Sequence, residues 1–254
     1  MFTPKPDGTP GDPIAMYSMA GLAEYSVVPI NGVYKLPESL PALESCILGC
    51  ALFTAYGAVK NAGLSLGGRP GASVVVIGTG GVGSNVIQVC KAFGASKIIA
   101  VDIDDAKLQF AKTMGATHVI NSKKSTKSVP EQVVDIVGKA KGGADVAFEV
   151  LGNPITFNDA VLSVCDGGRA VMVGIAPINT YAKVDITRLV RRKITIVGSY
   201  GAKARVDTPE VIDLIERGAL SLGSITKVYS LDEAANAYDD LKNGRITGKA
   251  IVKI

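Results

Sequence analysis

The chain has 254 residues, of which 47% are hydrophobic and 20% charged, and its formal net charge is +4. This size and composition predict a globular protein with ample core, in one large domain or slightly more. No apolar run reaches the length of a membrane span, so we expect no membrane protein. The modest charge gives no support to a nucleic-acid-binding function, which is therefore not expected.

Thiol usage and the opening segment indicate the compartment. The polar, proline-rich start MFTPKPDGTPGDP has no apolar core of a signal peptide. Four cysteines lie in apolar surroundings without disulfide-like spacing: Cys46, Cys50, Cys90 and Cys165. Reduced thiols and a cytoplasmic location are the expectation.

The first 50 residues predict few regular elements. Alternating apolar residues predict a strand over Ala23–Pro29, and a second short strand is expected around Val33–Leu36. A proline-flanked segment then leads into a helix that carries both Cys46 and Cys50. Residues four apart share one face of a helix, which suggests a pair of metal ligands or two small core residues.

The segment Ser73–Asp102 reads SVVVIGTGGVGSNVIQVCKAFGASKIIAVD. An apolar run meets a glycine series, a helix-period segment follows, and a second apolar run ends on an aspartate. This order of strand, turn, helix, strand and terminal carboxylate is typical of a dinucleotide-binding site. A glycine-rich turn in an ordinary βαβ unit is the less specific alternative.

The turn Gly78-Thr79-Gly80-Gly81-Val82-Gly83 supplies the candidate phosphate-binding residues. Gly78 permits the tight turn, Gly80 lets the backbone approach a pyrophosphate, and Gly83 lets the helix lie close to the strand. The free N–H groups at the start of the helix favour a phosphate there.

Asp102 is the candidate ligand of the ribose hydroxyls, nineteen residues after Gly83. Its carboxylate would repel a 2′-phosphate, and the next residue is Ile103 rather than a cation, so NAD is favoured over NADP. Lys107 is close enough in sequence to contact the ribose region, although a solvated helix lysine is an equal alternative.

Apolar runs alternate with helix-period segments through residue 198. We expect strands at Val74–Ile77, Ile98–Val101, His118–Asn121, Asp145–Val150, Ala170–Gly174 and Ile194–Gly198. We expect the intervening helices at Ser84–Phe93, Asp104–Met114, Val129–Ala140 and Thr156–Val164. This pattern predicts an α/β fold with a doubly wound parallel sheet of the Rossmann type. Ligands bind at the carboxyl ends of such strands, which adds Gly152 and Val173 to the candidate site.

Beyond Tyr200 the sequence predicts two helices and a closing strand. Thr208 with Pro209 predicts the start of one helix, and Ser230-x-x-Glu233 forms the capping box of the other. The strand is expected over Ala250–Ile254. Both chain ends together are compatible with a small second domain. The basic residues between Arg188 and Lys193 lack interleaved aromatic residues, so a solvated face is preferred to a nucleic-acid patch.

Five segments carry a resemblance to a known family: LPESLPALESCILGCALFTAYGA, VVVIGTGGVGSNVIQVCKAFGASKIIAVDI, FEVLGNP, AVMVGIAP and GKAIVKI. From about Gly21 onward the chain resembles the zinc-type medium-chain alcohol dehydrogenases. The resemblance implies remnants of a GroES-like β domain at residues 1–51, a Rossmann NAD-binding domain at 52–199 and a return to the catalytic domain at 200–254. It also implies hydride transfer between NAD and an alcohol/aldehyde pair, and a homo-oligomer formed through the edge strand Ile194–Gly198.

Site roles also follow from the resemblance. Cys50 resembles the cysteine that supplies one zinc ligand, and Thr54 a threonine against the nicotinamide. Val173 and Ile175 resemble residues that line the nicotinamide pocket, and Lys249 a basic residue near the pyrophosphate. Cys46 falls at no ligand position in the family, so we interpret it as a small core residue. His118 falls at no ligand or relay position either.

The chain departs from the family in its first part. The other zinc ligands and the proton relay belong to a region that this sequence lacks, so we expect an N-terminally truncated copy with an incomplete zinc site. Apolar surface left uncovered would favour self-association. The alternative function is a catalytically inactive short form that binds NAD and dimerises, and a zinc-free reductase is a weaker third.

Overall fold

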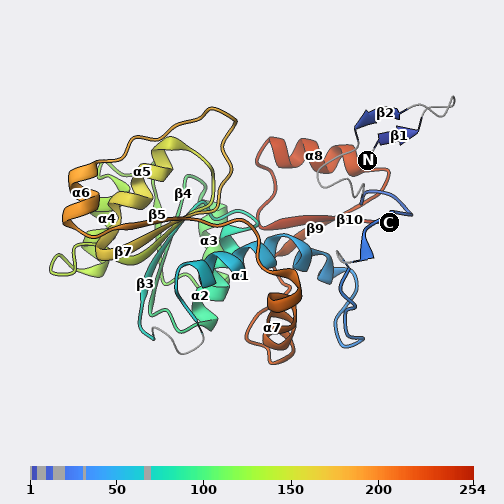
Figure 1. Ribbon diagram of the computed structural model, residues 1–254, viewed down its shortest axis with the longest axis horizontal. Helices are drawn as coiled ribbons and strands as arrows, with labels where there is room; N and C mark the ends of the chain where they lie inside the picture. The colour runs from blue at the N-terminus through green and yellow to red at the C-terminus, as the bar shows by residue number, and fades with distance from the viewer. Residues whose placement is uncertain (1, 5–9, 14–20, 31–32, 66–69) are drawn as a thin grey trace.

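A parallel sheet of six strands forms the centre of the larger part of the protein, with the C-terminal elements beside it (Figure 1). The computed structural model describes residues 2–4, 10–13, 21–30, 33–65 and 70–254. The strands are β3 (Ser73–Ile77), β4 (Lys97–Asp102), β5 (His118–Asn121), β6 (Ala144–Glu149), β7 (Val164–Met172) and β8 (Thr195–Gly198). Their spatial order is β5-β4-β3-β6-β7-β8, with every neighbouring pair parallel. The predicted doubly wound α/β fold is confirmed.

Helices cover both faces of this sheet, which explains its apolar strands. Val74 and Val76 of β3 belong to a core shared with α1 (Ala51–Asn61), α2 (Gly83–Ala92) and α3 (Asp105–Thr113). Val75 and Ile77 point to the other side, into a core shared with α4 (Val129–Val137) and α5 (Pro154–Leu162). All five residues of β3 are buried, as expected for a central strand between two helical layers.

The boundaries of the predicted elements shift most around α5 and β7. The helix begins at Pro154, where Asn153 caps it by accepting a hydrogen bond from Ile155 N–H at 2.8 Å. It ends at Leu162, and β7 begins at Val164 rather than Ala170. The sequence Asp166-Gly167-Gly168 interrupts the apolar run, which hid the first part of β7 from pattern analysis.

The predicted helix with both early cysteines is wrong. A 3₁₀ helix, η3 (Glu44–Gly49), carries Cys46, and α1 begins after Cys50. Cys50 has φ −136° and ψ −72°, so the helical path breaks between the two thiols and they share no helix face. Cys46 is exposed, which also corrects its interpretation as a core residue.

The two early strands are not formed either. Residues 23–29 and 33–36 have no strand pairing, although the structure has a short antiparallel pair, β1 (Phe2–Pro4) and β2 (Pro10–Pro13). Tyr25, Val27 and Ile30 are exposed by 90%, 76% and 88%. An alternating strand needs a partner strand and a core to cover its apolar face. Neither is supplied to this segment by the described residues, and the expected uncovered apolar surface is confirmed.

The C-terminal segment forms a small unit beside the main sheet (Figure 1). It consists of α7 (Ala204–Glu216), β9 (Ile225–Ser230), α8 (Ala234–Lys242) and β10 (Lys249–Lys253), with β9 and β10 paired in parallel. The sequence analysis missed β9 and placed the start of α7 too late. Pro209 lies inside α7, because the side chain of Asp207 accepts the N–H of Lys203 at 2.6 Å and fixes an earlier start.

The predicted capping box before α8 forms in part. The carboxylate of Glu233 accepts hydrogen bonds from the N–H and the hydroxyl of Ser230 at 2.9 and 3.0 Å. The helix itself begins only at Ala234, with Glu233 rather than Ser230 as its N-cap. The contact therefore orders the turn between β9 and α8 instead of starting the helix.

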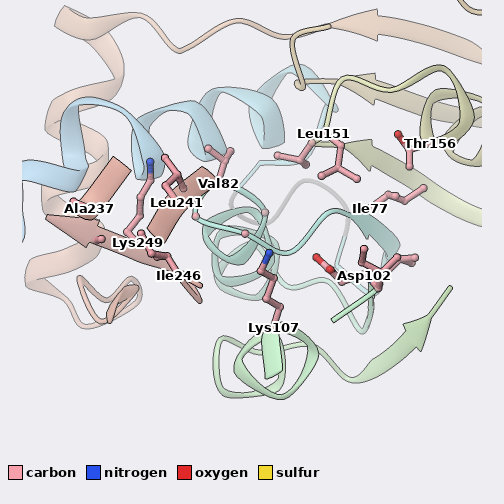
Figure 2. Close-up of a pocket in the computed structure, with 18 of the residues that line it drawn as sticks. Ile77, Val82, Asp102, Lys107, Leu151, Thr156, Ala237, Leu241, Ile246 and Lys249 are labelled. Carbon is pink, nitrogen blue, oxygen red and sulfur yellow. Dashed lines mark hydrogen bonds between the residues drawn. The ribbon is translucent and has the colours of Figure 1, made fainter. Parts of the chain in front are cut away.

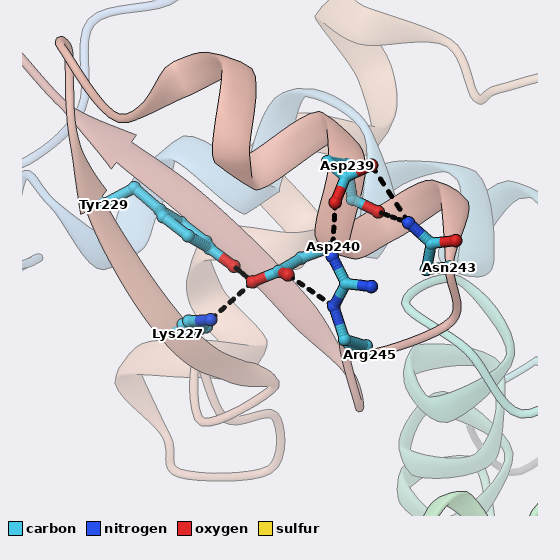
Figure 3. Close-up of polar contacts among 6 residues, drawn as sticks. All are labelled: Lys227, Tyr229, Asp239, Asp240, Asn243 and Arg245. Atoms are coloured by element: carbon cyan, nitrogen blue, oxygen red, sulfur yellow. Dashed lines mark hydrogen bonds and ion pairs between the residues drawn. The ribbon is translucent and has the colours of Figure 1, made fainter.

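Asp240 joins α8 to β9 (Figure 3). Its carboxylate accepts hydrogen bonds from Lys227 at 2.5 Å, from the Tyr229 hydroxyl and from Arg245 Nε at 2.6 Å. Hydrogen bonds from Lys227, Tyr229 and Arg245 hold the pKa of this carboxyl well below its ordinary value. Ionic contacts and hydrogen bonds thus hold α8 against β9 within the small C-terminal unit.

A polar cluster holds α7 against α1. Lys60 Nζ lies 2.7 Å from Asp207 and 3.1 Å from Glu210, and the hydroxyl of Tyr56 donates to Glu210. The backbones approach closely here, because a Cβ on Gly57 would overlap the carbonyl oxygen of Gly201.

The described residues contain no helix long and apolar enough to cross a membrane.

Candidate functional site

The glycine turn between β3 and α2 has the geometry that its sequence predicts. Gly78 has φ +91°, a backbone conformation that residues with a Cβ rarely adopt. A Cβ on Gly83 would overlap the carbonyl oxygen of Gly78, so only glycine lets the helix start this close to the strand. A Cβ on Gly80 would meet no heavy atom within 4 Å, so the chain leaves open space above this residue.

That open space belongs to a cleft of about 650 Å³ (Figure 2). Its walls come from the glycine turn, the ends of β4 and β6, and the C-terminal unit around α8 and β10. The predicted site residues that line it are Gly80, Gly81, Val82, Gly83, Asp102, Lys107 and Lys249. The volume falls in the range of small-molecule and cofactor sites.

Asp102 sits at the end of β4 and is tightly held. One carboxylate oxygen accepts the N–H and the hydroxyl of Thr79 at 2.9 and 3.0 Å. The other accepts the N–H groups of Ile103 and Asp104 at 2.8 and 3.2 Å. Thr79 is fully buried and contributes to this hydrogen bonding rather than to the cleft wall. The turn and the carboxylate are therefore built as one rigid unit.

Two lysines reach the cleft from opposite parts of the chain. Lys107 lies on α3, and Figure 2 shows its amine directed toward the cleft that Asp102 also lines. Lys249 begins β10, and its aliphatic stem lies over the glycine turn, since a Cβ on Gly81 would be 2.7 Å from Lys249 Cδ. Together with Asp102 these are the charged side chains that line the cleft, which gives it a net positive charge.

A buried network places Lys249 relative to the turn. Asn85 donates to the carbonyl oxygen of Gly81 at 2.6 Å and to the hydroxyl of Ser224 at 3.2 Å. The N–H of Lys249 donates to the carbonyl oxygen of Ser224 at 2.7 Å. Gln88 continues the network by donating to Asn85 at 2.6 Å and to Ser221 at 3.1 Å. Sequence analysis missed all of these positions except Gly81 and Lys249.

Gly152, Val173 and Ile175 lie together in the loops after β6 and β7, although they do not line the described cleft. The buried carboxylate of Glu149 accepts the Gly152 N–H at 2.9 Å. The backbone carbonyl oxygen of Glu149 accepts the Val173 N–H at 2.8 Å. A Cβ on Gly152 would lie within 2.7 Å of backbone next to Ile175. Glu149 thus organises both loops and was not singled out from the sequence.

Other wall residues were also missed, because they come from several separate parts of the chain, including the segment treated as a return to another domain. These apolar or polar wall residues are Leu22, Leu151, Thr156, Tyr238, Leu241, Ile246 and Val252. The apolar run Ala250–Val252 in β10 was the signal that could have found Val252.

Thr54 and Cys50 do not line the cleft. Thr54 lies in the first turn of α1, where its N–H donates to the carbonyl oxygen of Cys50 at 2.8 Å. Cys50 is exposed. Among the described residues, no three His, Cys, Asp or Glu side chains are close enough to hold a metal ion. His118 is exposed at the start of β5, with Nδ1 2.9 Å from the Thr117 hydroxyl.

Comparisons with known proteins identify the family. The model of the zinc-binding dehydrogenases matches residues 81–217, more than half of the chain. The chain is 32% identical over 252 residues to S-(hydroxymethyl)glutathione dehydrogenase of Paracoccus denitrificans, covering 94% of this chain and 66% of that protein. It is 30% identical over 260 residues to alcohol dehydrogenase class-3 of Cereibacter sphaeroides, covering 97% and 68%.

Solved structures agree with the sequence relatives. Benzyl alcohol dehydrogenase from Acinetobacter calcoaceticus superposes with a TM-score of 0.79 at 34% identity, over 87% of this chain and 59% of that one. The chain belongs to the zinc-binding dehydrogenase family, and the resemblance seen in its sequence is confirmed. It spans about two thirds of the length of the curated relatives that it matches.

The family name implies a metal, and the described residues do not fit one. A catalytic zinc needs three protein ligands and an open position. Cys50 belongs to no group of three or more potential metal ligands in the described part of the chain. A dinucleotide does fit, because the glycine turn leaves open space at Gly80 next to a positively charged cleft.

Proposed function

We propose that the cleft binds NAD and that the chain is the cofactor-binding part of an alcohol dehydrogenase. The observation that carries this proposal is the joint position of the glycine turn, Asp102 and Lys249 in the walls of one cleft. N–H groups at the start of α2 and the ammonium of Lys249 would hold the pyrophosphate. The carboxylate of Asp102 would accept the hydroxyls of the adenosine ribose.

NAD is preferred to NADP on electrostatic grounds. A 2′-phosphate would approach the Asp102 carboxylate, and the exposed residue that follows is the apolar Ile103. Lys107 lines the same cleft and is the nearest candidate to interact with the ribose. Its single charge would have to overcome the repulsion from Asp102 to admit NADP, so we expect NAD to bind more tightly.

The residues of this chain bind and orient, and the cofactor supplies the chemistry: bound NAD accepts or donates a hydride. The loops with Gly152, Val173 and Ile175 would form the nicotinamide side of the site, with Thr54 against the ring and Cys50 as a metal ligand once others are supplied. An alcohol/aldehyde pair is the proposed substrate class, by similarity to the relatives. We also propose a cytoplasmic protein.

The proposed domain organisation follows the chain order. Residues 1–51 and 200–254 would belong to a GroES-like catalytic domain, and residues 52–199 to the NAD-binding domain. The position of α8, β9 and β10 beside the six-stranded sheet supports a boundary near residue 200. The cleft would then lie between the two domains, where a dehydrogenase holds substrate carbon and nicotinamide in contact.

Titration of the chain with NADH, followed by cofactor fluorescence, tests the proposal. Lys249→Gln should weaken NADH binding about tenfold, because it removes a charge-assisted hydrogen bond to phosphate. Lys253→Gln removes the same charge from the far end of β10 and is the matched control. Equal NADH affinities for the unsubstituted protein, Lys249→Gln and Lys253→Gln would reject the cofactor site. Alcohol-dependent NADH formation with added zinc tests turnover separately.

A second candidate function is an inactive NAD-binding short form that dimerises. Two observations favour it: β8 is an edge of the six-stranded sheet, and the described residues offer no complete metal site. An edge strand leaves one row of backbone groups free to pair with a second copy. Sedimentation should show a dimer, and a monodisperse monomer without dye-accessible apolar surface would exclude this form.

A further inference from the structure

A second groove lies on the side of the sheet covered by α4 and α5. It has a volume of about 450 Å³ and is lined by residues of α4 and α6 (Ile186–Arg191), together with Gly142 and Leu162. It shares no lining residue with the proposed cofactor cleft. The groove contains part of the basic cluster that the proposed function leaves without a role.

The groove carries an excess of positive charge. Its lining contains four cations, namely Lys127, Lys139, Arg188 and Arg192. Its two carboxylates already have partners, because Asp135 accepts from Lys127 at 2.6 Å and Glu131 accepts from the N–H and hydroxyl of Ser128 at 2.8 and 2.7 Å. Three cations therefore face the groove without a carboxylate from its own walls.

Arg188 is the cation of this groove that has a buried donor without a partner. It donates from Nη2 to the carbonyl oxygen of Leu162 at 3.0 Å, but its buried Nε has no hydrogen-bond partner and it forms no ion pair with any residue that the structure describes. A buried donor on a charged group without a partner is costly. Burial and the positive charge of Arg192 lower the pKa of Arg188.

Arg192 lies one helical turn further on and is fixed in position. Its Nε pairs with Asp166, and its Nη2 donates to the carbonyl oxygen of Gly142 at 3.3 Å. The positive charges of Arg188 and Arg192, four residues apart, repel each other, and an anion bound between them would attract both. Guanidinium groups match phosphate oxygens with two parallel hydrogen bonds, so the pair suits a phosphate better than a chloride.

The remaining wall is apolar and comes from Pro130, Val134 and Leu162. We propose that this groove binds a small phosphate monoester, with the phosphate on Arg188, Arg192 and Lys139 and its organic part against the apolar wall. The ligand is a small organic phosphate rather than inorganic phosphate, because the groove is much larger than one phosphate group and only part of its wall is charged.

Calorimetric titration at low ionic strength tests this site, with phenyl phosphate and inorganic phosphate as probes. We expect saturable binding, severalfold tighter for phenyl phosphate because the ring buries apolar surface. Arg188→Gln should weaken both probes about tenfold. Arg191→Gln removes the same charge from an exposed position of α6 outside the groove and should leave both affinities unchanged.

Two further variants keep the outcome decisive. Lys139→Gln changes a lysine without an ion pair among the described residues and should weaken binding severalfold even if Arg188→Gln folds poorly. Lys249→Gln removes one of the two lysines of the cofactor cleft and should have no effect on binding in this groove. The proposal is overturned if Arg191→Gln or Lys249→Gln weakens binding as much as Lys139→Gln, if no saturable binding occurs, or if phenyl phosphate binds no more tightly than inorganic phosphate.

Discussion

The side-chain amide of Asn85 donates a hydrogen bond to the carbonyl oxygen of Gly81 at 2.6 Å. The same amide donates to Ser224, whose carbonyl oxygen accepts the N–H of Lys249. One buried residue thus links the glycine turn to the cation that lies over it. The proposed pyrophosphate site depends on this link, because the glycine turn and Lys249 lie far apart in the sequence.

Asn85→Ala should lower both stability and cofactor affinity. The substitution leaves the Ser224 hydroxyl without its partner and removes one of the hydrogen bonds of the buried Gln88, which costs about 1–3 kcal/mol of unfolding free energy. Urea unfolding measures this loss. Asn243→Ala, at an exposed asparagine bonded to Asp239, should change stability by only about 0.5 kcal/mol or less. Similar losses in the two variants would contradict the role given to Asn85.

Two glycines of the turn should respond differently to the same added methyl group. Gly83→Ala places a Cβ against the carbonyl oxygen of Gly78, so the protein should unfold at a clearly lower temperature. Gly80→Ala meets no protein atom within 4 Å, so the melting temperature should stay unchanged while NADH binding weakens. Thermal melts with and without NADH separate these effects. A Gly80→Ala protein with unaltered affinity would argue against phosphate binding at this turn.

Stability should fall in acid through the contact of α7 with α1. Burial alone would raise the pKa of Asp207, but hydrogen bonds from Lys60 and from the Lys203 N–H lower it below its ordinary value of 3.8. A carboxyl whose pKa is lower in the folded state stabilises the fold above its unfolded pKa, and this contribution is lost as the pH falls below about 3.8.

Asp207→Asn should therefore lower the melting temperature at pH 7 and flatten its decline between about pH 5 and pH 2.5. Asp213→Asn is the control, since Asp213 pairs with Arg217 at a half-exposed position of the same helix. That variant should retain the full acid dependence. Parallel pH profiles for the two variants would show that Asp207 is not the group involved.

The four thiols should differ in reactivity. Cys46 and Cys50 are exposed, whereas Cys90 is fully buried and burial raises its pKa well above the ordinary value. Iodoacetamide followed by peptide mass spectrometry should modify the two exposed thiols first and Cys90 only on unfolding. Added zinc should not protect Cys50, because Cys50 belongs to no group of three or more potential ligands among the described residues. Strong protection by zinc would reveal a metal site that lies beyond the described residues.

The sequence predicted the sheet and the glycine turn because their signals are local. Val74–Ile77, the turn and Asp102 are close along the chain, and each residue's role follows from backbone geometry that its neighbours determine. His118–Asn121 was predicted with its observed limits. Buried parallel strands between two helical layers have continuous apolar runs that pattern analysis detects well.

Residues outside the sheet were predicted less well, because their structure depends on distant partners. The alternation in Ala23–Pro29 predicts a strand only if another strand is available to pair with it. Asn85 and Ser224 meet across 139 positions, and no local pattern marks such a pair. Thr208-Pro209 has the form of a helix start, but α7 begins at Ala204, where Asp207 accepts the Lys203 N–H and also pairs with the distant Lys60.

The position of Lys249 over the Gly81 turn has a consequence for the motions of the folded protein. A ligand that touches both would favour molecules in which β10 is docked, so opening of β9 and β10 would require its release. Their amide hydrogens should then exchange with solvent more slowly in the presence of NADH, while those of α6 keep their rates. Binding in the cleft would then be measurable as slower amide exchange in β9 and β10, a strand pair that lies outside the main sheet.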